Sequence, residues 1–377
     1  MYYLSLFCYN DFMKSYIIAE IGTSHEGDFT KAKKLIDAAA KAGADCVKFQ
    51  WVYAREILHP KTGFVDLPTG KIPLYNRFLQ LEVKKSFYKK CRDYAHSKNL
   101  DFGCSPFGIK SLRQLMALNP DMIKIASPEL NHFPMLEELC KLQQKRKNKI
   151  PVILSSGVSK EEDIKKAIEV FEKNNQKETI SLLHCVTSYP APEEDYNLKV
   201  LTYLKNQFDV KVGVSDHSLN PIIVPLGGYL AGGEIIEKHI TLSNETEGLD
   251  DPVALNPENF KKMVEVLRVF ENEPKEKILE YLETNFGKEK IALVLGTGEK
   301  RLAKAEEANY TRTNRSIHFM KDLKAGHKIK KSDIGILRTE KILSVGISPE
   351  FYQKVLGKKL KVDVKDGEGL LFEHLET

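Results

Sequence analysis

The chain is 377 residues long, and its 42% hydrophobic and 29% charged residues are typical of a folded globular protein and exclude a largely disordered one. No apolar run approaches the roughly 20 residues that a membrane-spanning helix needs, so we expect no membrane partner. The 57 Lys+Arg and 52 Asp+Glu residues give a net charge of +5. The segment from Thr311 to the end holds 14 of the basic and 9 of the acidic residues, so the excess positive charge lies there.

The basic residues of this C-terminal segment stand mainly in the runs KIKK and GKKLK. Neither run is interleaved with aromatic residues, and neither has the pattern of an amphipathic helix. We therefore predict that the protein has no nucleic-acid partner and no membrane contact. A solvent-exposed basic surface is the simplest interpretation, and a basic cap over an anion-binding site is the alternative.

The cysteine pattern and the N-terminus are typical of a cytoplasmic protein. The six cysteines include no Cys-x-x-Cys pair and no zinc-finger spacing, so we expect reduced, mostly buried thiols. Residues 1–8 are apolar but lack the basic region and the cleavage site of a secretion signal. We interpret residues 1–14 as an N-terminal extension.

Apolar, β-rich runs alternate with helical patterns along most of the chain. The first run, at 17–22, is followed by an amphipathic stretch at 30–43 that ends on a glycine. Seven further runs stand at 45–51, 100–106, 121–127, 150–157, 179–187, 210–216 and 234–240. A Pro/Gly-rich loop at 60–73 and a helix at 85–98 follow the second run, and the last helix covers 257–270.

Eight strands, each followed by a helix, predict a (β/α)8 TIM barrel, a fold of about 250 residues. An open doubly wound sheet alternates in the same way, but no G-x-G-x-x-G follows the first strand, which disfavours a dinucleotide-binding fold. We predict an α/β protein with a barrel over 15–285, a linker over 286–310 and a small β-rich domain over 311–377. That last domain has short strands, AGH and DGEG turns, and one helix near 349–356.

Active sites of such barrels lie at the carboxyl ends of the strands, and polar residues recur at that end of every predicted strand. Two lysines and four serines among them are the cations and donors that hold phosphate and carboxylate. They are Lys48, Ser105, Lys124, Ser127, Ser155 and Ser215. A single interior lysine is as well explained by a salt bridge, but two lysines on separate strands favour an anionic ligand.

Two histidines, His217 and His239, stand at the mouths of the seventh and eighth strands. They could coordinate one divalent metal, although either histidine alone is more simply explained by a hydrogen-bonded role. Two imidazoles with oxygen donors would suit Mn²⁺ better than Mg²⁺.

Eight ordered motifs of this chain closely resemble those of the N-acetylneuraminate (sialic acid) synthase family. They are AEIGTSHEG, VKFQ, CSPF, IKIASPE, ILSSG, LLHCVTSYPAP, GVSDHS and EKHIT. The later segments NRSI and DLKAGHKIKKSDI resemble the C-terminal antifreeze-like (SAF) domain of the same family. The resemblance runs from about Tyr16 to the end of the chain.

The resemblance implies an enzyme that condenses phosphoenolpyruvate with an N-acetylated hexosamine, N-acetylmannosamine or a relative, to a nonulosonic acid and phosphate. It also implies a divalent metal, usually Mn²⁺ with Mg²⁺ or Co²⁺ as options, at His217 and His239. Phosphoenolpyruvate positions match Lys48, Ser105, Lys124, Ser127, Ser155 and Ser215, and Glu20 matches the acid/base glutamate. Sugar-side positions match Gln50, Thr187, Tyr189 and Asp250, and Arg315 matches an arginine that enters the site of the other subunit in a domain-swapped homodimer.

Three departures from the family pattern bear on the sugar. Thr187 stands where some members have Asn, and GLDD replaces the usual GPDH, which puts Asp251 where His is expected. The segment ILRTEKILSVG lacks the Arg-Pro-Gly common there. A legionaminic or pseudaminic acid synthase that uses a diacetamido hexose is therefore an open alternative.

Two further alternatives are weaker. A 3-deoxy-ulosonate phosphate synthase is disfavoured by the SAF-like segment, and a non-catalytic carbohydrate-binding protein is disfavoured by the intact Glu20, lysines and histidines. The basic cap becomes specific at Arg315, and Arg315→Ala is expected to weaken sugar use more than it alters stability.

Overall fold

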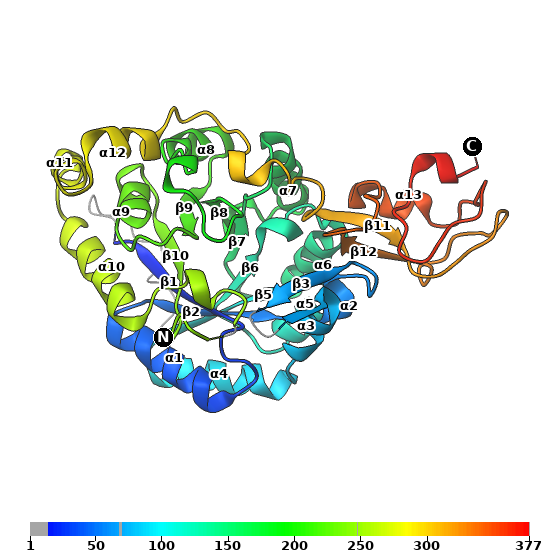
Figure 1. Ribbon diagram of the computed structural model, residues 1–377, viewed down its shortest axis with the longest axis horizontal. Coiled ribbons are helices and arrows are strands. Elements are labelled where there is room, and N and C mark those ends of the chain that lie inside the picture. Colours follow the sequence, from blue (N-terminus) through cyan, green and yellow to red (C-terminus); the bar gives the residue numbers. More distant parts are fainter. Residues whose placement is uncertain (1–13, 68–69, 247, 377) are drawn as a thin grey trace.

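The computed structural model describes residues 14–67, 70–246 and 248–376, so most of the predicted N-terminal extension and Cys8 lie outside the described residues. Eight parallel strands close into a barrel in the order β1-β10-β9-β8-β7-β6-β5-β2, which confirms the predicted fold (Figure 1). The strands are β1 (Tyr16–Gly22), β2 (Cys46–Trp51), β5 (Asp101–Pro106), β6 (Met122–Ile125), β7 (Val152–Ser155), β8 (Ile180–Cys185), β9 (Lys211–Asp216) and β10 (Ile235–His239).

Helices surround the barrel and bury their apolar faces against it. Helix α1 ends as predicted at Gly43, which is in the left-handed region at φ 87°. At its start the Asp28 side chain accepts the Thr30 N–H, a cap that was not predicted from the sequence. The other helices of this layer are α4 (Lys85–Ser97), α5 (Ile109–Met116), α6 (Phe133–Gln144), α7 (Glu161–Lys173), α8 (Val200–Phe208), α9 (Ile223–Leu230) and α10 (Pro257–Phe270), and α1 is Phe29–Ala42.

Two regions expected to be irregular contain regular structure. The loop at 60–73 includes the hairpin of β3 (Phe64–Leu67) and β4 (Gly70–Pro73), and it is flanked by α2 (Ala54–Ile57) and α3 (Leu74–Gln80). The segment expected to be a linker includes the end of α11 (Lys275–Phe286) and all of α12 (Lys288–Leu295). Ile291 and Val294 of α12 are buried in the barrel's main core, because the short run IALVL presents one apolar side to α9 and α11.

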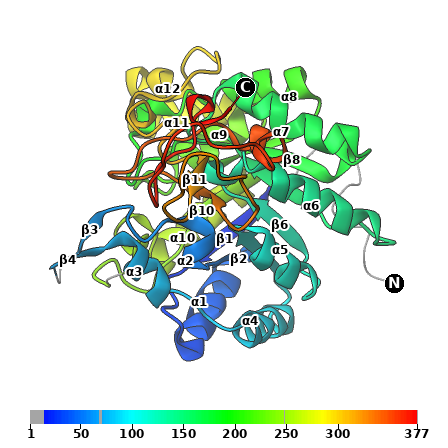
Figure 2. The ribbon, with the colours of Figure 1, turned by 90° about the vertical axis from the view of Figure 1, so that its right-hand side faces the viewer.

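The C-terminal segment forms a small unit with its own core. Strands β11 (Arg315–Phe319) and β12 (Ile334–Arg338) pair antiparallel, and α13 (Tyr352–Val355) falls where a helix was predicted. Buried apolar residues of this unit, among them Phe319 and Leu370, form a cluster separate from that of the barrel. Figures 1 and 2 show the unit, coloured orange to red, on one side of the barrel, with β12 against α2.

The described cysteines, Cys46, Cys91, Cys104, Cys140 and Cys185, are all buried and free of disulfides. None of the helices in the described ranges is both long and apolar enough to cross a membrane.

Candidate active site

The barrel interior is divided into an apolar layer and a charged layer. Ile18, Cys46, Met122, Ile153, Leu183 and Ile235 form a separate apolar cluster among the inward-facing side chains of the strands. Because side chains of a strand alternate with a period of two, the residue two positions further on each strand faces the same interior. Those residues form the next layer toward the carboxyl ends: Glu20, Lys48, Ser105, Lys124, Ser155, Cys185, Ser215 and Glu237. Six of the eight are predicted site residues.

Two lysines and two glutamates carry the charge of this layer. Lys48 Nζ lies 2.7 Å from Glu20 Oε2 and 3.7 Å from Glu237 Oε1. Lys124 Nζ donates to both oxygens of Glu237, at 2.8 and 3.0 Å, and the Ser215 hydroxyl donates to the same carboxylate at 2.9 Å. Burial by itself would raise the pKa of Glu237, but the charges of Lys124 and Lys48 outweigh it and hold that pKa well below its usual range.

Glu237 was missed as a functional residue in the sequence, although it stands in the EKHIT motif. The signal that could have found it is the period of two: Ile235 is in the apolar layer, so Glu237 must face the lysines. Its carboxylate holds both cations in the barrel interior, where an unpaired charge would be costly. An anionic ligand that reaches Lys48 and Lys124 would therefore compete with Glu237 for them.

Hydroxyl groups line the same end of the barrel without full use of their hydrogen-bonding capacity. Ser155 Oγ and Thr187 Oγ1 are buried and have no hydrogen-bond partner among the described residues. Ser127 Oγ accepts the Gly157 N–H at 3.0 Å, and the Ser105 hydroxyl accepts a long contact from Lys48 at 3.4 Å. Buried polar groups usually have partners, so unpartnered hydroxyls beside two lysines are the expected lining of an oxyanion site.

The predicted base and two predicted sugar-side residues lie together at the end of β1. Gln50 Nε2 donates to Glu20 Oε1 at 2.9 Å, which orients the glutamate. Gly22 has φ 57°, and a Cβ there would lie 3.2 Å from both Asp250 Oδ2 and Gln50 Nε2. The bare glycine thus lets Asp250 approach Glu20, and burial raises the pKa of Asp250.

Asp251, a departure from the family pattern, is fully buried. Its Oδ1 accepts the Ser24 hydroxyl at 2.5 Å, and its Oδ2 accepts the Thr246 hydroxyl. The bond to Ser24 joins the loop after β10 to the loop after β1, and the bond to Thr246 lies within the loop after β10. The aspartate therefore holds the segment that carries Asp250 over the mouth of the barrel.

The two predicted metal ligands are neighbours. The rings of His217 and His239 have centroids 5.5 Å apart, and Tyr189 stacks on His217 at 4.2 Å. His217 Nδ1 lies 2.9 Å from the Val186 carbonyl, which can only accept, so Nδ1 carries the proton and Nε2 keeps its lone pair. Burial lowers the pKa of His239 to about 3, so both rings are neutral near pH 7 and able to bind a metal.

The donor set fits a divalent ion only in part. Across residues 14–67, 70–246 and 248–376 there is no group of three or more His, Cys, Asp or Glu side chains with the spacing of a metal site. An ion at His217 and His239 would therefore take its other ligands from water or substrate, which is the open coordination of a catalytic site.

A buried ion pair supports the loop that bears His217. Lys238 Nζ lies 2.5 Å from Asp216 Oδ2, on the residue before His217, and both side chains are fully buried.

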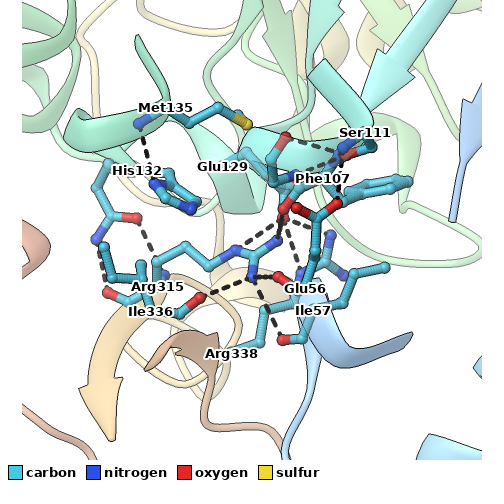
Figure 3. Close-up of polar contacts among 12 residues, drawn as sticks. Glu56, Ile57, Phe107, Ser111, Glu129, His132, Met135, Arg315, Ile336 and Arg338 are labelled. Carbon is cyan, nitrogen blue, oxygen red and sulfur yellow. Dashed lines mark hydrogen bonds and ion pairs between the residues drawn. The ribbon is translucent and has the colours of Figure 1, made fainter. Parts of the chain in front are cut away.

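Arg315 lies at the junction of the C-terminal unit and the barrel of the same chain (Figure 3). Its guanidinium is buried, with Nε and Nη2 donating to Glu129 Oε1 at 3.1 and 2.8 Å. The remaining N–H groups donate to the backbone carbonyls of Glu56, Ile57, Phe107 and Ile336. Arg338 donates to the same Glu129 oxygen at 3.0 and 2.8 Å, so two arginines share one carboxylate.

We expect Arg315→Ala to lower the free energy of unfolding by about 3 kcal/mol, because it breaks a buried ion pair and leaves several carbonyls unpaired. Arg315→Lys should recover only part of this loss, since an ammonium cannot reach the same set of acceptors. Urea unfolding measures both changes, with the exposed Lys324→Ala as the control. Equal stability of Arg315→Ala and the parent chain would contradict the structural role. The sequence-based expectation was a larger effect on sugar use than on stability, and the buried guanidinium adds a substantial stability effect to it.

The fold and the charged layer define a parallel barrel with buried lysines, glutamates and hydroxyls at one end of its interior, followed by a small β domain. The NeuB family model matches residues 35–278, and the SAF domain model matches residues 314–376. The N,N'-diacetyllegionaminic acid synthase of Campylobacter jejuni is 32% identical over 360 residues, with 94% of this chain and 98% of that protein covered. The pseudaminic acid synthase of the same species is 31% identical over 367 residues, with 96% and 97% covered.

A solved structure is similar to this chain over both the barrel and the C-terminal domain. The spore coat polysaccharide biosynthesis protein SpsE of Bacillus subtilis superimposes with a TM-score of 0.80 at 29% identity, covering 97% of this chain and 96% of that one. The chain belongs to the NeuB family and carries the C-terminal SAF domain of that family. It is a phosphoenolpyruvate-dependent enzyme that forms a carbon–carbon bond, as the sequence resemblance implied.

Proposed function

We propose that the protein condenses phosphoenolpyruvate with an N-acetylated hexosamine, N-acetylmannosamine or a relative, to a nonulosonic acid and phosphate. The observation that carries this proposal is the charged layer, in which two buried lysines and several hydroxyls surround one end of the barrel interior. We infer that the phosphate and carboxylate of phosphoenolpyruvate bind there, at Lys48, Lys124 and the serines Ser105, Ser127, Ser155 and Ser215. The negative charge of the phosphate and carboxylate would take the place of the Glu237 carboxylate beside the two lysines.

Glu20 is the base of this proposal. The methylene carbon of phosphoenolpyruvate forms a bond to the aldehyde carbon of the open-chain sugar, and the cationic C2 that results is captured by water. The carboxylate of Glu20 accepts a proton from that water and passes it to the alkoxide formed from the aldehyde oxygen. The bond from C2 to the phosphate oxygen then breaks, and the C2 hydroxyl gives its proton to the departing phosphate to leave a ketone. Gln50 and Lys48, which contact the two Glu20 oxygens, hold the carboxylate in one orientation for this role.

The sugar would enter from the mouth of the barrel, past Gln50, Thr187, Tyr189 and Asp250. Tyr189 is 49% exposed, and its ring packs on His217, so it can contact both a sugar and solvent. A divalent metal held by His217 and His239, most simply Mn²⁺, would supply Lewis-acid polarisation of the aldehyde oxygen when bound. The neutral imidazoles support this assignment.

Removal of the metal should abolish phosphate release, and Mn²⁺ should restore it. Direct titration of the metal-free protein with Mn²⁺ by calorimetry gives a readout that needs no turnover. We expect His217→Ala to lower the affinity for Mn²⁺ by more than ten-fold, because one of two protein ligands is lost. His96→Ala, which changes a histidine on helix α4, is the matched control. Full activity after exhaustive chelation would overturn the metal assignment.

A diacetamido hexose is the second candidate for the sugar, and the similarity to legionaminic and pseudaminic acid synthases favours it. The deciding experiment offers phosphoenolpyruvate and Mn²⁺ with a panel of 2-acetamido, 2,4-diacetamido and phosphorylated hexoses. Phosphate release and the mass of the product identify the substrate, with Glu20→Gln as the blank. Sugar binding without phosphate release for every member of the panel would instead support a non-catalytic protein.

We also propose that the enzyme acts in the cytoplasm as a domain-swapped homodimer. Domain swapping exchanges identical contacts between two copies, so the contacts of Arg315 with Glu129 could form within one chain or between two. Mixing the impaired variants Glu20→Gln and Arg315→Ala tests this. Activity should rise in the mixed dimer if Arg315 serves the partner's site, and a mixture no more active than its components would count against the swap.

A further inference from the structure

The loop that follows β7 contains a residue in an unfavourable conformation. Val158 has φ 42°, in the left-handed region, where a β-branched side chain is a genuine outlier. The residue is fully buried and directly follows the run Ser155-Ser156-Gly157, which includes a proposed phosphoenolpyruvate contact. Such conformations persist only where the surrounding structure holds them, and they occur often at functional sites.

Two residues far along the chain hold this loop. Glu306, from the segment between α12 and β11, is 1% exposed, and its Oε1 accepts the Val158 N–H at 2.7 Å. The same oxygen accepts the Thr187 N–H at 2.7 Å, so one carboxylate joins the loops after β7 and β8. On the other side of Val158, the buried Asn314 side chain donates to the Val158 carbonyl at 2.9 Å.

These contacts meet at the anion-binding end of the proposed site. A Cβ at Gly157 would collide with Thr187 Oγ1, and it would lie 2.9 Å from Ser127 Oγ and 3.1 Å from Glu306 Oε1. The carboxylate and the two hydroxyls therefore surround one glycine, whose N–H is bound by Ser127. Thr187 Oγ1 and Ser155 Oγ, within the described chain, are left without partners and are free for a ligand.

We propose that Glu306 and Asn314 are positioning residues for phosphoenolpyruvate: they hold the Gly157–Val158 backbone so that the hydroxyls of Ser127 and Ser155 face the anion. Neither side chain need touch the substrate. The affinity for phosphoenolpyruvate then depends on the docking of the segment that leads into the SAF domain. This inference rests on the proposed function, since it takes phosphoenolpyruvate as the anion.

The first test compares Glu306→Ala, Glu306→Gln and the adjacent exposed Glu307→Ala. Glu306→Ala should raise the KM for phosphoenolpyruvate at least ten-fold and the KM for the sugar clearly less, because the contact of Glu306 with the sugar-side Thr187 is lost as well. Glu306→Gln keeps one acceptor oxygen, so its KM for phosphoenolpyruvate should lie between that of Glu306→Ala and that of the parent. Glu307→Ala should have the KM of the parent. An unchanged KM for phosphoenolpyruvate in Glu306→Ala, or equal rises for both substrates, would overturn the proposal.

Hydrogen exchange supplies a readout without turnover. The amides of Val158 and Thr187 should lose protection in Glu306→Ala, while amides in the strand β1 keep it, which also shows that the barrel is folded. Retained protection at both amides would refute the role of Glu306 even if the enzyme uses another substrate. If the parent chain releases no phosphate with any sugar, the proposed function fails, and the exchange result still decides the role of Glu306.

A rescue variant separates backbone positioning from a general loss of packing. Glycine adopts the left-handed region without strain, so Val158→Gly in the Glu306→Ala background should recover part of the lost affinity for phosphoenolpyruvate. A further loss of affinity in the double variant would contradict the proposed reason for the effect. Asn314→Ala should raise the KM for phosphoenolpyruvate less than Glu306→Ala does, because it removes only one neutral hydrogen bond to the loop, the other Asn314 bond being to the Thr311 N–H.

Discussion

Glu20→Gln is expected to lower turnover by about 10²–10⁴-fold, the usual contribution of a general base, with no loss of affinity for phosphoenolpyruvate. The amide cannot accept the proton of the attacking water. The structure adds that Glu20 lies 2.7 Å from Lys48, so the variant also frees a lysine for the anionic substrate. Binding of phosphoenolpyruvate should therefore stay the same or tighten.

Steady-state kinetics and calorimetric titration with phosphoenolpyruvate separate the two effects. Glu26→Gln is the matched control, because Glu26 is a nearby exposed carboxylate that pairs with Lys31 at the surface. A variant at Glu20 with full turnover would remove this residue from the mechanism. A variant that fails to bind phosphoenolpyruvate would show instead that Glu20 shapes the site.

The second large effect is expected at Glu237. Glu237→Gln leaves Lys124 without its ion-pair partner in the barrel interior and should lower the free energy of unfolding by about 3–5 kcal/mol. Phosphoenolpyruvate should restore more stability to the variant than to the parent, because its negative charge takes the place of the lost carboxylate. Thermal unfolding with and without phosphoenolpyruvate measures both the loss of stability in the variant and the stabilisation by the ligand.

Glu169→Gln, which breaks an exposed pair with Lys173, is the control and should change stability by less than about 1 kcal/mol. The pH dependence provides a second check. The lysines lower the folded-state pKa of Glu237, so its contribution to stability is complete above the unfolded pKa of about 4.3 and is lost as the pH falls further. The difference between parent and variant should shrink over that acid range, and a constant difference would contradict the ion-pair explanation.

The excess positive charge of the C-terminal segment has a partial structural explanation. Arg315 and Arg338, both from that segment, converge on Glu129 of the barrel. The C-terminal segment also contributes an acidic group to this junction, because its Asp366 pairs with Lys61 and His59 of the preceding part of the chain. These contacts support the interpretation that part of the basic surface serves domain docking, while exposed lysines such as Lys324 remain solvated.

Much of the site followed from the sequence because it depends on local rules. The alternation of apolar runs and helices specifies a barrel, and the carboxyl ends of its strands must meet on one face. The period of two along a strand then brings Glu20, Lys48 and Lys124 into one layer without any knowledge of long-range contacts. The motif order added the family, which the comparisons confirmed.

Only the tertiary structure decided which partners these residues have. The pairing of Lys124 with Glu237 joins strands that are far apart in the chain, and the contacts of Glu129 with Arg315 and of Val158 with Glu306 cross from the barrel to the C-terminal part. Local patterns carry no information about such pairs, because many charged residues fit the same helix or strand pattern equally well. The sequence by itself determined the barrel, the lysines and serines at the ends of its strands, and the family. Long-range packing determined the place of Glu237 between the lysines, which charges neutralise one another and which distant residues hold the loops of the site.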